Sequence, residues 1–114
     1  MKLSEVVKLT EGKILCGDEH HDADLGQAFS SDLMSDVLTL GMTDILLITG
    51  LVNLQVIRTA EMADIKHILL VRNKTVSKDI IELAKSSGVC LIHSPVSMFK
   101  ASGELYHAGL KSIY

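Results

Sequence analysis

The sequence is poor in several residue types that particular functions need. It has no tryptophan, aromatic residues make up 4% of its 114 positions, and the formal net charge is -3. Proteins that bind single-stranded nucleic acids stack bases on aromatic side chains, and nucleic-acid-binding domains in general carry a basic stripe that neutralises phosphates. Because the lysines and arginines are scattered singly here, we expect no nucleic acid among the partners.

Long apolar segments and paired cysteines are also lacking. No apolar run approaches the roughly 20 residues that a membrane-spanning helix needs, and residues 1–13 contain no signal-peptide core. Cys16 and Cys90 lie far apart in short apolar runs, which is typical of reduced, buried thiols rather than of a disulfide framework. We therefore expect a cytoplasmic protein with no membrane partner.

What the sequence does contain is the composition of one folded domain, which we assign to residues 1–114. Hydrophobic residues make up 47% and charged residues 22%, and the mean hydropathy is +0.32. Because few polar residues are available to cover the surface, we expect some apolar area to be buried between subunits and predict a homodimer.

Short apolar runs alternate with amphipathic segments along the whole chain. Strand patterns occupy 13–17, 27–31, 44–49, 67–71 and 89–93, and helical patterns occupy 1–12, 31–41, 53–63, 76–88 and 96–110. This alternation is the signature of right-handed βαβ units. It predicts an α/β fold, a three-layer sandwich around a mainly parallel sheet.

The segment SDLMSDVLTLG is one of the expected helices. Ser31 is suited to be its N-cap, and Asp32 would favour the first turn. Leu33, Val37 and Leu40 have the spacing of an inner apolar stripe.

The turn ITGLVN follows a buried strand and precedes a helix, the place where ligands collect in open α/β sheets. Thr49 can donate a hydroxyl, Gly50 allows a close backbone approach, and Asn53 can cap the helix or contact a ligand. Free N–H groups at a helix start favour anions. Arg58 would reach such an anion only if it faced the same side.

Two further corners are expected at the same edge of the sheet, after the strands 67–71 and 89–93. They would bring Arg72, Asn73, Lys74 and His93 together as a basic and polar cluster in an acidic chain. The alternative is that all these residues are ordinary turn residues on a wet surface. A turn with one glycine is neither G-x-G-x-x-G nor a P-loop, so the prediction is a site for a nucleotide or another small anion without a catalytic motif.

The segment CGDEHHDAD offers metal-ligating residue types, namely Cys16, His20, His21, Asp22 and Asp24. Adjacent histidines are awkward ligands for one ion, and the segment has neither a helical i, i+4 His pair nor a C-x-x-C partner. A solvated acidic turn explains the segment more simply. We expect no metal and no cofactor.

Residue types that serve as nucleophiles or bases are present but stand in no diagnostic context. No G-x-S-x-G elbow surrounds them, and a thiol within an apolar strand is usually inert. Asp32 and Asp36 would share a helix face, which capping and solvation explain without a paired-carboxylate site. We therefore expect no enzyme activity from these candidates: Ser30, Ser31, His67, Cys90, His93 and His107.

The last helical pattern, VSMFKASGELYHAGL, mixes apolar and aromatic residues with Gly103 and Gly109. It is compatible with packing inside the monomer and equally with a subunit interface, where Met and aromatic residues are enriched.

Four segments together resemble one known family over nearly the whole chain: SSDLMSDVL, LLITGLVNLQVIRTAEMADI, VRNK and MFKASGELYHAGL. The chain resembles the DRTGG domain family, in particular the small stand-alone members encoded beside iron-only hydrogenase genes. That family is similar to the N-terminal domain of HPr kinase/phosphorylase, and its domain is also found attached to CBS domains in a regulated pyrophosphatase. Of the naming motif this chain keeps little, with Gly50-Leu51-Val52 in place of Gly-Asp-Arg.

The resemblance implies a regulatory or oligomerising domain rather than a catalyst, because the P-loop of the HPr kinase belongs to a different domain. Two functions stay open from the sequence. One is the sensing of a nucleotide or small anion, and the other is a protein–protein adaptor without a ligand in hydrogenase maturation or redox regulation.

Overall fold

A six-stranded sheet forms the centre of the molecule. The computed structural model describes residues 1–41 and 44–114, and its strands lie in the order β1-β5-β4-β3-β2-β6. Their bounds are β1 Lys13–Cys16, β2 Gln27–Ser30, β3 Ile45–Thr49, β4 His67–Leu70, β5 Cys90–His93 and β6 Lys111–Ser112.

The inner strands β2 to β5 are all parallel, which confirms the predicted α/β class with a mainly parallel sheet. All residues of β3 and β4 are buried, as expected for strands that are covered on both faces. Two features of the sheet were not predicted. The edge strand β1 runs antiparallel to β5, and the short edge strand β6 pairs with β2.

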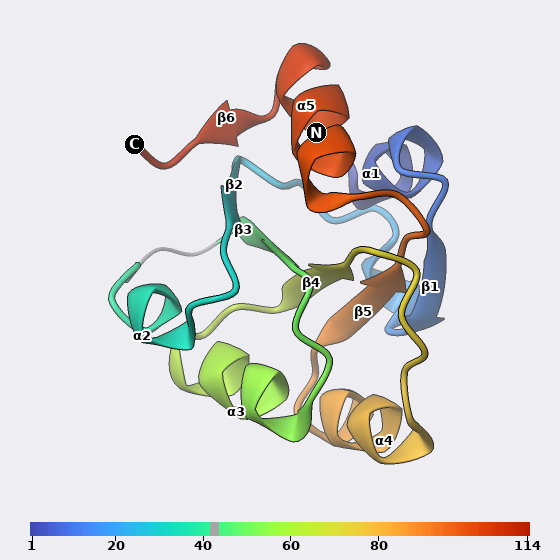
Figure 1. Ribbon diagram of the computed structural model, residues 1–114, viewed down its shortest axis with the longest axis vertical. Helices are drawn as coiled ribbons and strands as arrows, with labels where there is room; N and C mark the ends of the chain where they lie inside the picture. The colour runs from blue at the N-terminus through green and yellow to red at the C-terminus, as the bar shows by residue number, and fades with distance from the viewer. Residues whose placement is uncertain (42–43) are drawn as a thin grey trace.

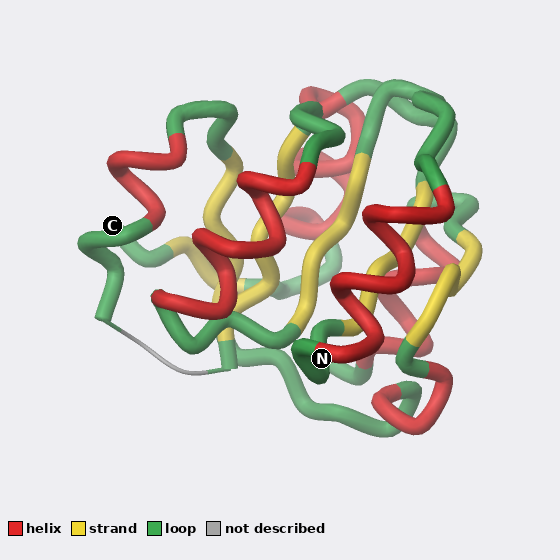
Figure 2. The backbone as a smooth tube through the Cα atoms, turned by 90° about the horizontal axis from the view of Figure 1, so that it is seen from below, coloured by secondary structure: helices red, strands yellow, loops and turns green. Residues whose placement is uncertain are grey.

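Helices cover both faces of the sheet and complete the three layers (Figure 1). On one face lie α1 Leu3–Leu9 and α5 Met98–His107, and on the other lie α2 Met34–Val37, α3 Leu54–Met62 and α4 Lys78–Ser86, with a short 3₁₀ turn, η1, at Asp18–His20. Figure 2 shows α2, α3 and α4 side by side across one face of the strands. Each face encloses its own apolar cluster. No helix within the described ranges is long and apolar enough to cross a membrane.

Three of the helices begin at a side chain that accepts a hydrogen bond from the first turn. Asn53 accepts from Val56 N at the start of α3, and Ser77 and Ser97 do the same for α4 and α5. Each cap satisfies a backbone N–H that has no partner within the helix. The caps fix where each helix begins after its strand, and so fix the loops at this edge of the sheet.

The helix expected over 31–41 is shorter than predicted and differently capped. It spans Met34–Val37, its N-cap is Leu33 without a side-chain hydrogen bond, and Leu33 is 58% exposed instead of facing inward. The prediction of Ser31 as N-cap and Asp32 in the first turn is therefore wrong, as is the shared helix face of Asp32 and Asp36. The physical reason is that Asp32 is held outside the helix by hydrogen bonds to β3 and the loop after it.

Candidate anion-binding site

The corner after β3 is built around a carboxylate that comes from another part of the chain. Thr49 ends β3 and is fully buried. Its hydroxyl donates a hydrogen bond to Asp32 Oδ1 over 3.0 Å, and Gly50 N donates to the same oxygen over 2.7 Å. Leu51 N donates in turn to Thr49 Oγ1 at 3.2 Å. The chain itself thus supplies an anion at the corner where the sequence predicted a ligand.

Arg72 completes this arrangement from the corner after β4. Its backbone lies in the left-handed region with φ 73° and is fixed by a hydrogen bond from Arg72 N to Val96 O at 2.7 Å. The guanidinium Nη1 lies 3.7 Å from Asp32 Oδ2. A Cβ at Gly50 would lie 2.9 Å from both Arg72 Cδ and Nη1, so a side chain at this position would push the arginine out of its present place beside the carboxylate. We call Asp32, Thr49, Gly50 and Arg72 the Asp32 corner.

Asn53, the remaining predicted residue of this loop, caps α3 through Oδ1, which accepts from Val56 N at 3.0 Å. That bond uses the side-chain oxygen for the helix. A substitution of Asn53 would therefore change the stability of α3 whether or not a ligand binds nearby.

The other three predicted residues line an open cleft at the ends of β4 and β5. Asn73, Lys74 and His93 lie there together with Lys13 of the edge strand β1, around a volume of about 440 Å³. Three of the lining residues are aliphatic, and none of the described lining residues is acidic. The full lining comprises Lys13, Leu15, Asn73, Lys74, Thr75, Val76, Ile81 and His93. We call this the Lys74 cleft.

Lys13 was not among the predicted site residues, because its place depends on the antiparallel pairing of β1. In the sheet, Lys13 lies opposite His93 of β5. Asn73 is held beside them by its left-handed backbone, φ 53°, and by a hydrogen bond from Asn73 N to Ser94 O at 3.1 Å. No local pattern in the sequence reports an edge pairing across 80 positions of the chain.

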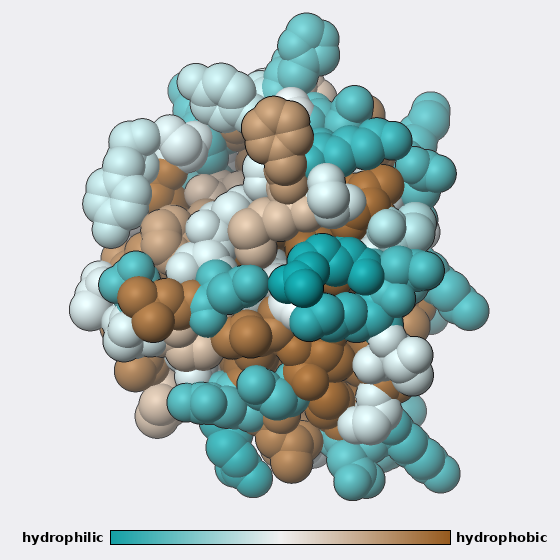
Figure 3. Space-filling model, viewed as in Figure 1, coloured by the Kyte–Doolittle hydropathy of each residue, from teal (hydrophilic) through white to brown (hydrophobic). Residues whose placement is uncertain are grey.

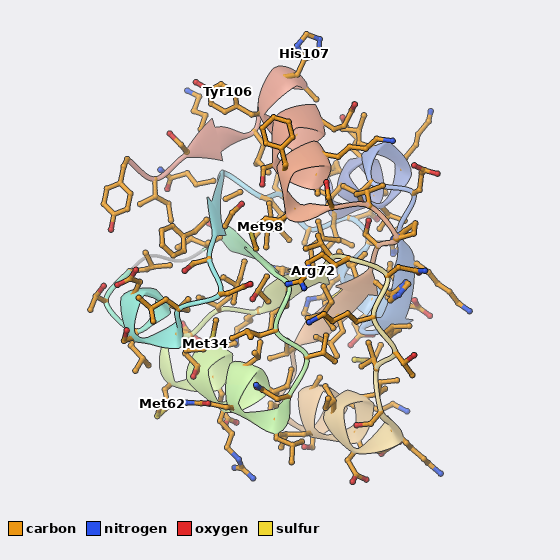
Figure 4. The ribbon with its side chains drawn as sticks, viewed as in Figure 1. Met34, Met62, Arg72, Met98, Tyr106 and His107 are labelled. Carbon is orange, nitrogen blue, oxygen red and sulfur yellow. The ribbon has the colours of Figure 1, made fainter. Side chains whose placement is uncertain are left out.

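The predicted cluster therefore divides into two neighbouring places joined by the segment Arg72–Asn73–Lys74. Arg72 lies near the centre of the face that Figure 4 shows, and the same region of the space-filling view is hydrophilic with apolar atoms beside it (Figure 3). The arginine points to the Asp32 corner, whereas the two residues after it line the Lys74 cleft.

At the other end of the parallel strands, where β4 begins, two histidines contact each other, a pairing that the sequence did not reveal. His20 Nδ1 lies 3.1 Å from His67 Nε2, and His67 is 8% exposed. Burial, and next the neighbouring His20, lower the pKa of His67 to about 4. Within the described ranges no group of three or more His, Cys, Asp or Glu side chains is placed to hold a metal ion.

The two thiols also have shifted protonation equilibria. Burial raises the pKa of Cys16, and it raises the pKa of Cys90 to about 12. Both cysteines are free and buried. Because the thiolate is the reactive form of cysteine, neither thiol is suited to act as a nucleophile at neutral pH.

Comparison with known proteins gives a match at the level of fold. No family model matches the sequence, and no curated protein matches it. A solved structure does match, that of the CBS and DRTGG domains of the regulatory region of Clostridium perfringens pyrophosphatase, complexed with its activator diadenosine tetraphosphate. The likeness has a TM-score of 0.73 at 19% sequence identity and covers 91% of this chain.

The fold is DRTGG-like. The chain spans 45% of the length of the pyrophosphatase region that it matches. At this level of identity the likeness concerns the architecture of the sheet and its helices, and side-chain function has to be argued from the residues of this chain.

Proposed function

We propose that this chain is a non-catalytic, ligand-sensing regulatory domain of the cytoplasm, and that the Lys74 cleft binds a nucleotide or another small anion. The observation that carries the proposal is the lining of the cleft, where Lys13, Lys74 and His93 surround a volume of about 440 Å³. Two ammonium groups and an imidazole beside apolar side chains suit a phosphate that is attached to a less polar group.

The position of the cleft supports the same proposal. It lies outside the carboxyl ends of β4 and β5, the edge at which ligands bind in open α/β sheets. The first turn of α4 follows directly after the cleft residues Lys74, Thr75 and Val76. The matched pyrophosphatase region is complexed with a nucleotide activator, and a nucleotide is therefore the first ligand class to test here.

The predicted residues take unequal parts in this proposal. Asn73, Lys74 and His93 contact the ligand, whereas Thr49, Gly50 and Arg72 hold the neighbouring corner through Asp32. Asn53 acts through the start of α3.

A thermal-shift titration tests the proposal with ATP, GTP, diadenosine tetraphosphate, acetyl phosphate and inorganic phosphate. A ligand that binds only the native state at 100 times its Kd stabilises that state by about 2.7 kcal/mol. We expect at least one phosphate compound to raise the melting temperature of the wild type, and Lys74→Gln to abolish the rise. Lys78→Gln is the matched control, because Lys78 is exposed on α4 and does not line the cleft. If none of these compounds changes the melting temperature of the wild type, the proposal is contradicted.

We further propose that the domain forms a homodimer. Several large apolar side chains around α2 and α3 are exposed: Leu33 58%, Leu38 46%, Leu54 42% and Met62 70%, and Figure 4 places Met62 at the lower left of the view. Apolar surface of this kind marks contact sites. Sedimentation at several concentrations tests the proposal, and a monomer at high concentration contradicts it.

The alternative function is a protein–protein adaptor without a ligand, associated with hydrogenase maturation or redox regulation as the family resemblance implies. The exposure of Phe99, 89%, and Tyr106, 71%, on α5 favours a contact surface. The two functions separate in the titration above, because an adaptor without a ligand gives no phosphate-dependent shift that Lys74→Gln abolishes.

A further inference from the structure

The Asp32 corner has the composition of an oxyanion site with a carboxylate bound in it. One oxygen of Asp32 accepts a backbone N–H from Gly50 at 2.7 Å and a hydroxyl hydrogen from Thr49 at 3.0 Å. The other oxygen faces the guanidinium of Arg72 at 3.7 Å. A backbone N–H, a hydroxyl and a guanidinium are the donors that proteins use for phosphate and carboxylate groups.

We propose that the Asp32 corner is a second anion-binding site, distinct from the Lys74 cleft, in which the Asp32 carboxylate is an intramolecular occupant that a small oxyanion replaces. The ligand class is a phosphate group or a small carboxylate. Such a ligand accepts the hydrogen bonds of Gly50 N and Thr49 Oγ1 and lies against Arg72, while Asp32 turns out to solvent.

The site is accessible for this exchange. The side chains of Arg72 and Asp32 are 51% and 42% exposed, so an ion from solvent reaches the guanidinium without unfolding of the sheet. Exposed ion pairs of this kind are weak because water and salt compete with them. The donors themselves are rigid, since Thr49 is fully buried at the end of β3 and Gly50 follows it directly.

Replacement of Asp32 would also change what the donors hold in place. The carboxylate connects the loop before α2 to the end of β3. An oxyanion at the corner keeps Gly50, Thr49 and Arg72 in position but breaks that connection. Binding therefore frees the Asp32 side chain from the end of β3, while Met34 and Val37 of α2 stay buried in the core, and the two states differ in what the donors hold.

The experiment removes the Asp32 carboxylate by substitution and measures which anions bind in its place. Asp32→Ala, Asp36→Ala and the wild type are titrated with sodium phosphate, acetate and formate, with sodium chloride holding the ionic strength constant. Asp36 is the matched control because it is an exposed carboxylate four residues away, in α2. We expect Asp32→Ala to show a saturable rise in melting temperature, with an apparent Kd for phosphate at least fivefold lower than in the wild type. Adding Arg72→Gln to Asp32→Ala should abolish the rise.

Equal responses of Asp32→Ala and Asp36→Ala would overturn the proposal. Should Asp32→Ala not fold, a titration of the ¹⁵N-labelled wild-type protein with phosphate, followed in ¹H–¹⁵N spectra, decides the question. A saturable movement of the Gly50 amide resonance is the expected result, and a Gly50 resonance that does not move at any phosphate concentration overturns the proposal.

The test of the Asp32 corner can be distinguished from the test of the Lys74 cleft. Lys74→Gln should abolish nucleotide binding in the cleft yet leave the phosphate response of Gly50 intact, because Lys74 takes no part in the hydrogen bonds and the ion pair that form the Asp32 corner. If Lys74→Gln loses the nucleotide response and keeps the Gly50 response, both sites are supported. If the wild type shows only one of the two responses, only the proposal for the other site is contradicted.

Discussion

The Asp32 corner and the Lys74 cleft lie at the same edge of the same sheet, yet one is filled and the other is open. Both are loops that follow buried parallel strands, and both carry cationic side chains. In the corner, Asp32 lies against Thr49, Gly50 and Arg72. In the cleft, Lys13, Lys74 and His93 line an open space without an acidic neighbour among the described lining residues.

The comparison shows that two loops at the same end of a parallel sheet can differ in whether the chain itself places an acidic side chain against their cations. Where the chain supplies its own carboxylate, the hydrogen bonds stabilise the fold but occupy the donors. Where the cations have no acidic partner, they add less to stability but are open to a ligand. The main difference between the Asp32 corner and the Lys74 cleft is one carboxylate, that of Asp32 in the loop before α2.

The largest expected effect on stability comes from His67, at the other end of the strands. Its titration limits the pH range in which the Asp32 corner and the Lys74 cleft can be compared. His67 has a pKa of about 4 in the folded protein, against an ordinary value of 6.5. The unfolded chain therefore binds more protons below pH 6.5, and the protein loses stability as the pH falls from 6.5 towards 4. At 1.36 kcal/mol per pKa unit, the loss from this group reaches about 3 kcal/mol by pH 4.

Urea unfolding of the wild type and His67→Gln between pH 7.5 and pH 4.5 measures this effect. We expect the variant to lose clearly less stability than the wild type over the range, because it lacks the titrating imidazole. His107→Gln, on α5, should behave as the wild type. An identical pH dependence in His67→Gln and the wild type would contradict the assignment.

Removal of the carboxylate from the filled corner should destabilise the protein next most strongly. Asp32→Ala leaves the Thr49 hydroxyl and Gly50 N without their acceptor. The loss of hydrogen bonds to a charged group is expected to cost about 2 kcal/mol in the free energy of unfolding. Asp36→Ala should stay within about 0.5 kcal/mol of the wild type, as exposed substitutions usually do. Chemical denaturation at pH 7.5 compares the two, and equal losses would show that Asp32 is not specially bound.

Asn53 gives a smaller effect that separates helix capping from ligand contact. Asn53→Ala should lower stability by about 1 kcal/mol, because Val56 N loses its acceptor. Asn53→Ser keeps a capping oxygen and should recover most of the loss. Neither variant should change the nucleotide-dependent thermal shift once its own lower melting temperature is taken as the reference. A shift lost in both variants would place Asn53 in the ligand site instead.

The open cleft should show the smallest effect on stability and the largest on binding. Lys13→Gln and Lys74→Gln remove charges that have no acidic partner in the cleft lining, so the free energy of unfolding should change by less than about 0.5 kcal/mol. The nucleotide response should weaken in Lys13→Gln and vanish in Lys74→Gln and in the double variant. A variant that is strongly destabilised would indicate that the cleft is structural.

The sequence predicts the framework of this protein well, for reasons that are visible in particular elements. The run from Ile45 to Thr49 is continuously apolar and is a buried strand. The helix that starts at Ser77 has both a capping residue and a clear apolar face, with Ile80 and Ala84 buried. Local composition decides such elements, because capping and burial of a helical stripe act within a few residues.

The site is less predictable, because its contacts connect distant parts of the chain. The sequence indicates the three corners, but not that Asp32 leaves its expected helix to bind Gly50. Nor does it indicate that Lys13 lies opposite His93. The helix expected over 31–41 is shorter and differently capped for the same reason, since tertiary hydrogen bonds of Asp32 outweigh a local capping pattern.

The most direct test of the account is a ¹H–¹⁵N spectrum of the wild type titrated with the nucleotide that raises its melting temperature most. The account predicts that the amide resonances of Asn73 and Lys74 and that of His93 move first and saturate together. Resonances of the last turn of α4, such as that of the exposed Lys85, should stay in place. Saturable movements confined to other parts of the sheet, with these three amides unchanged, would contradict the claim that the open cleft is where this domain binds its anion.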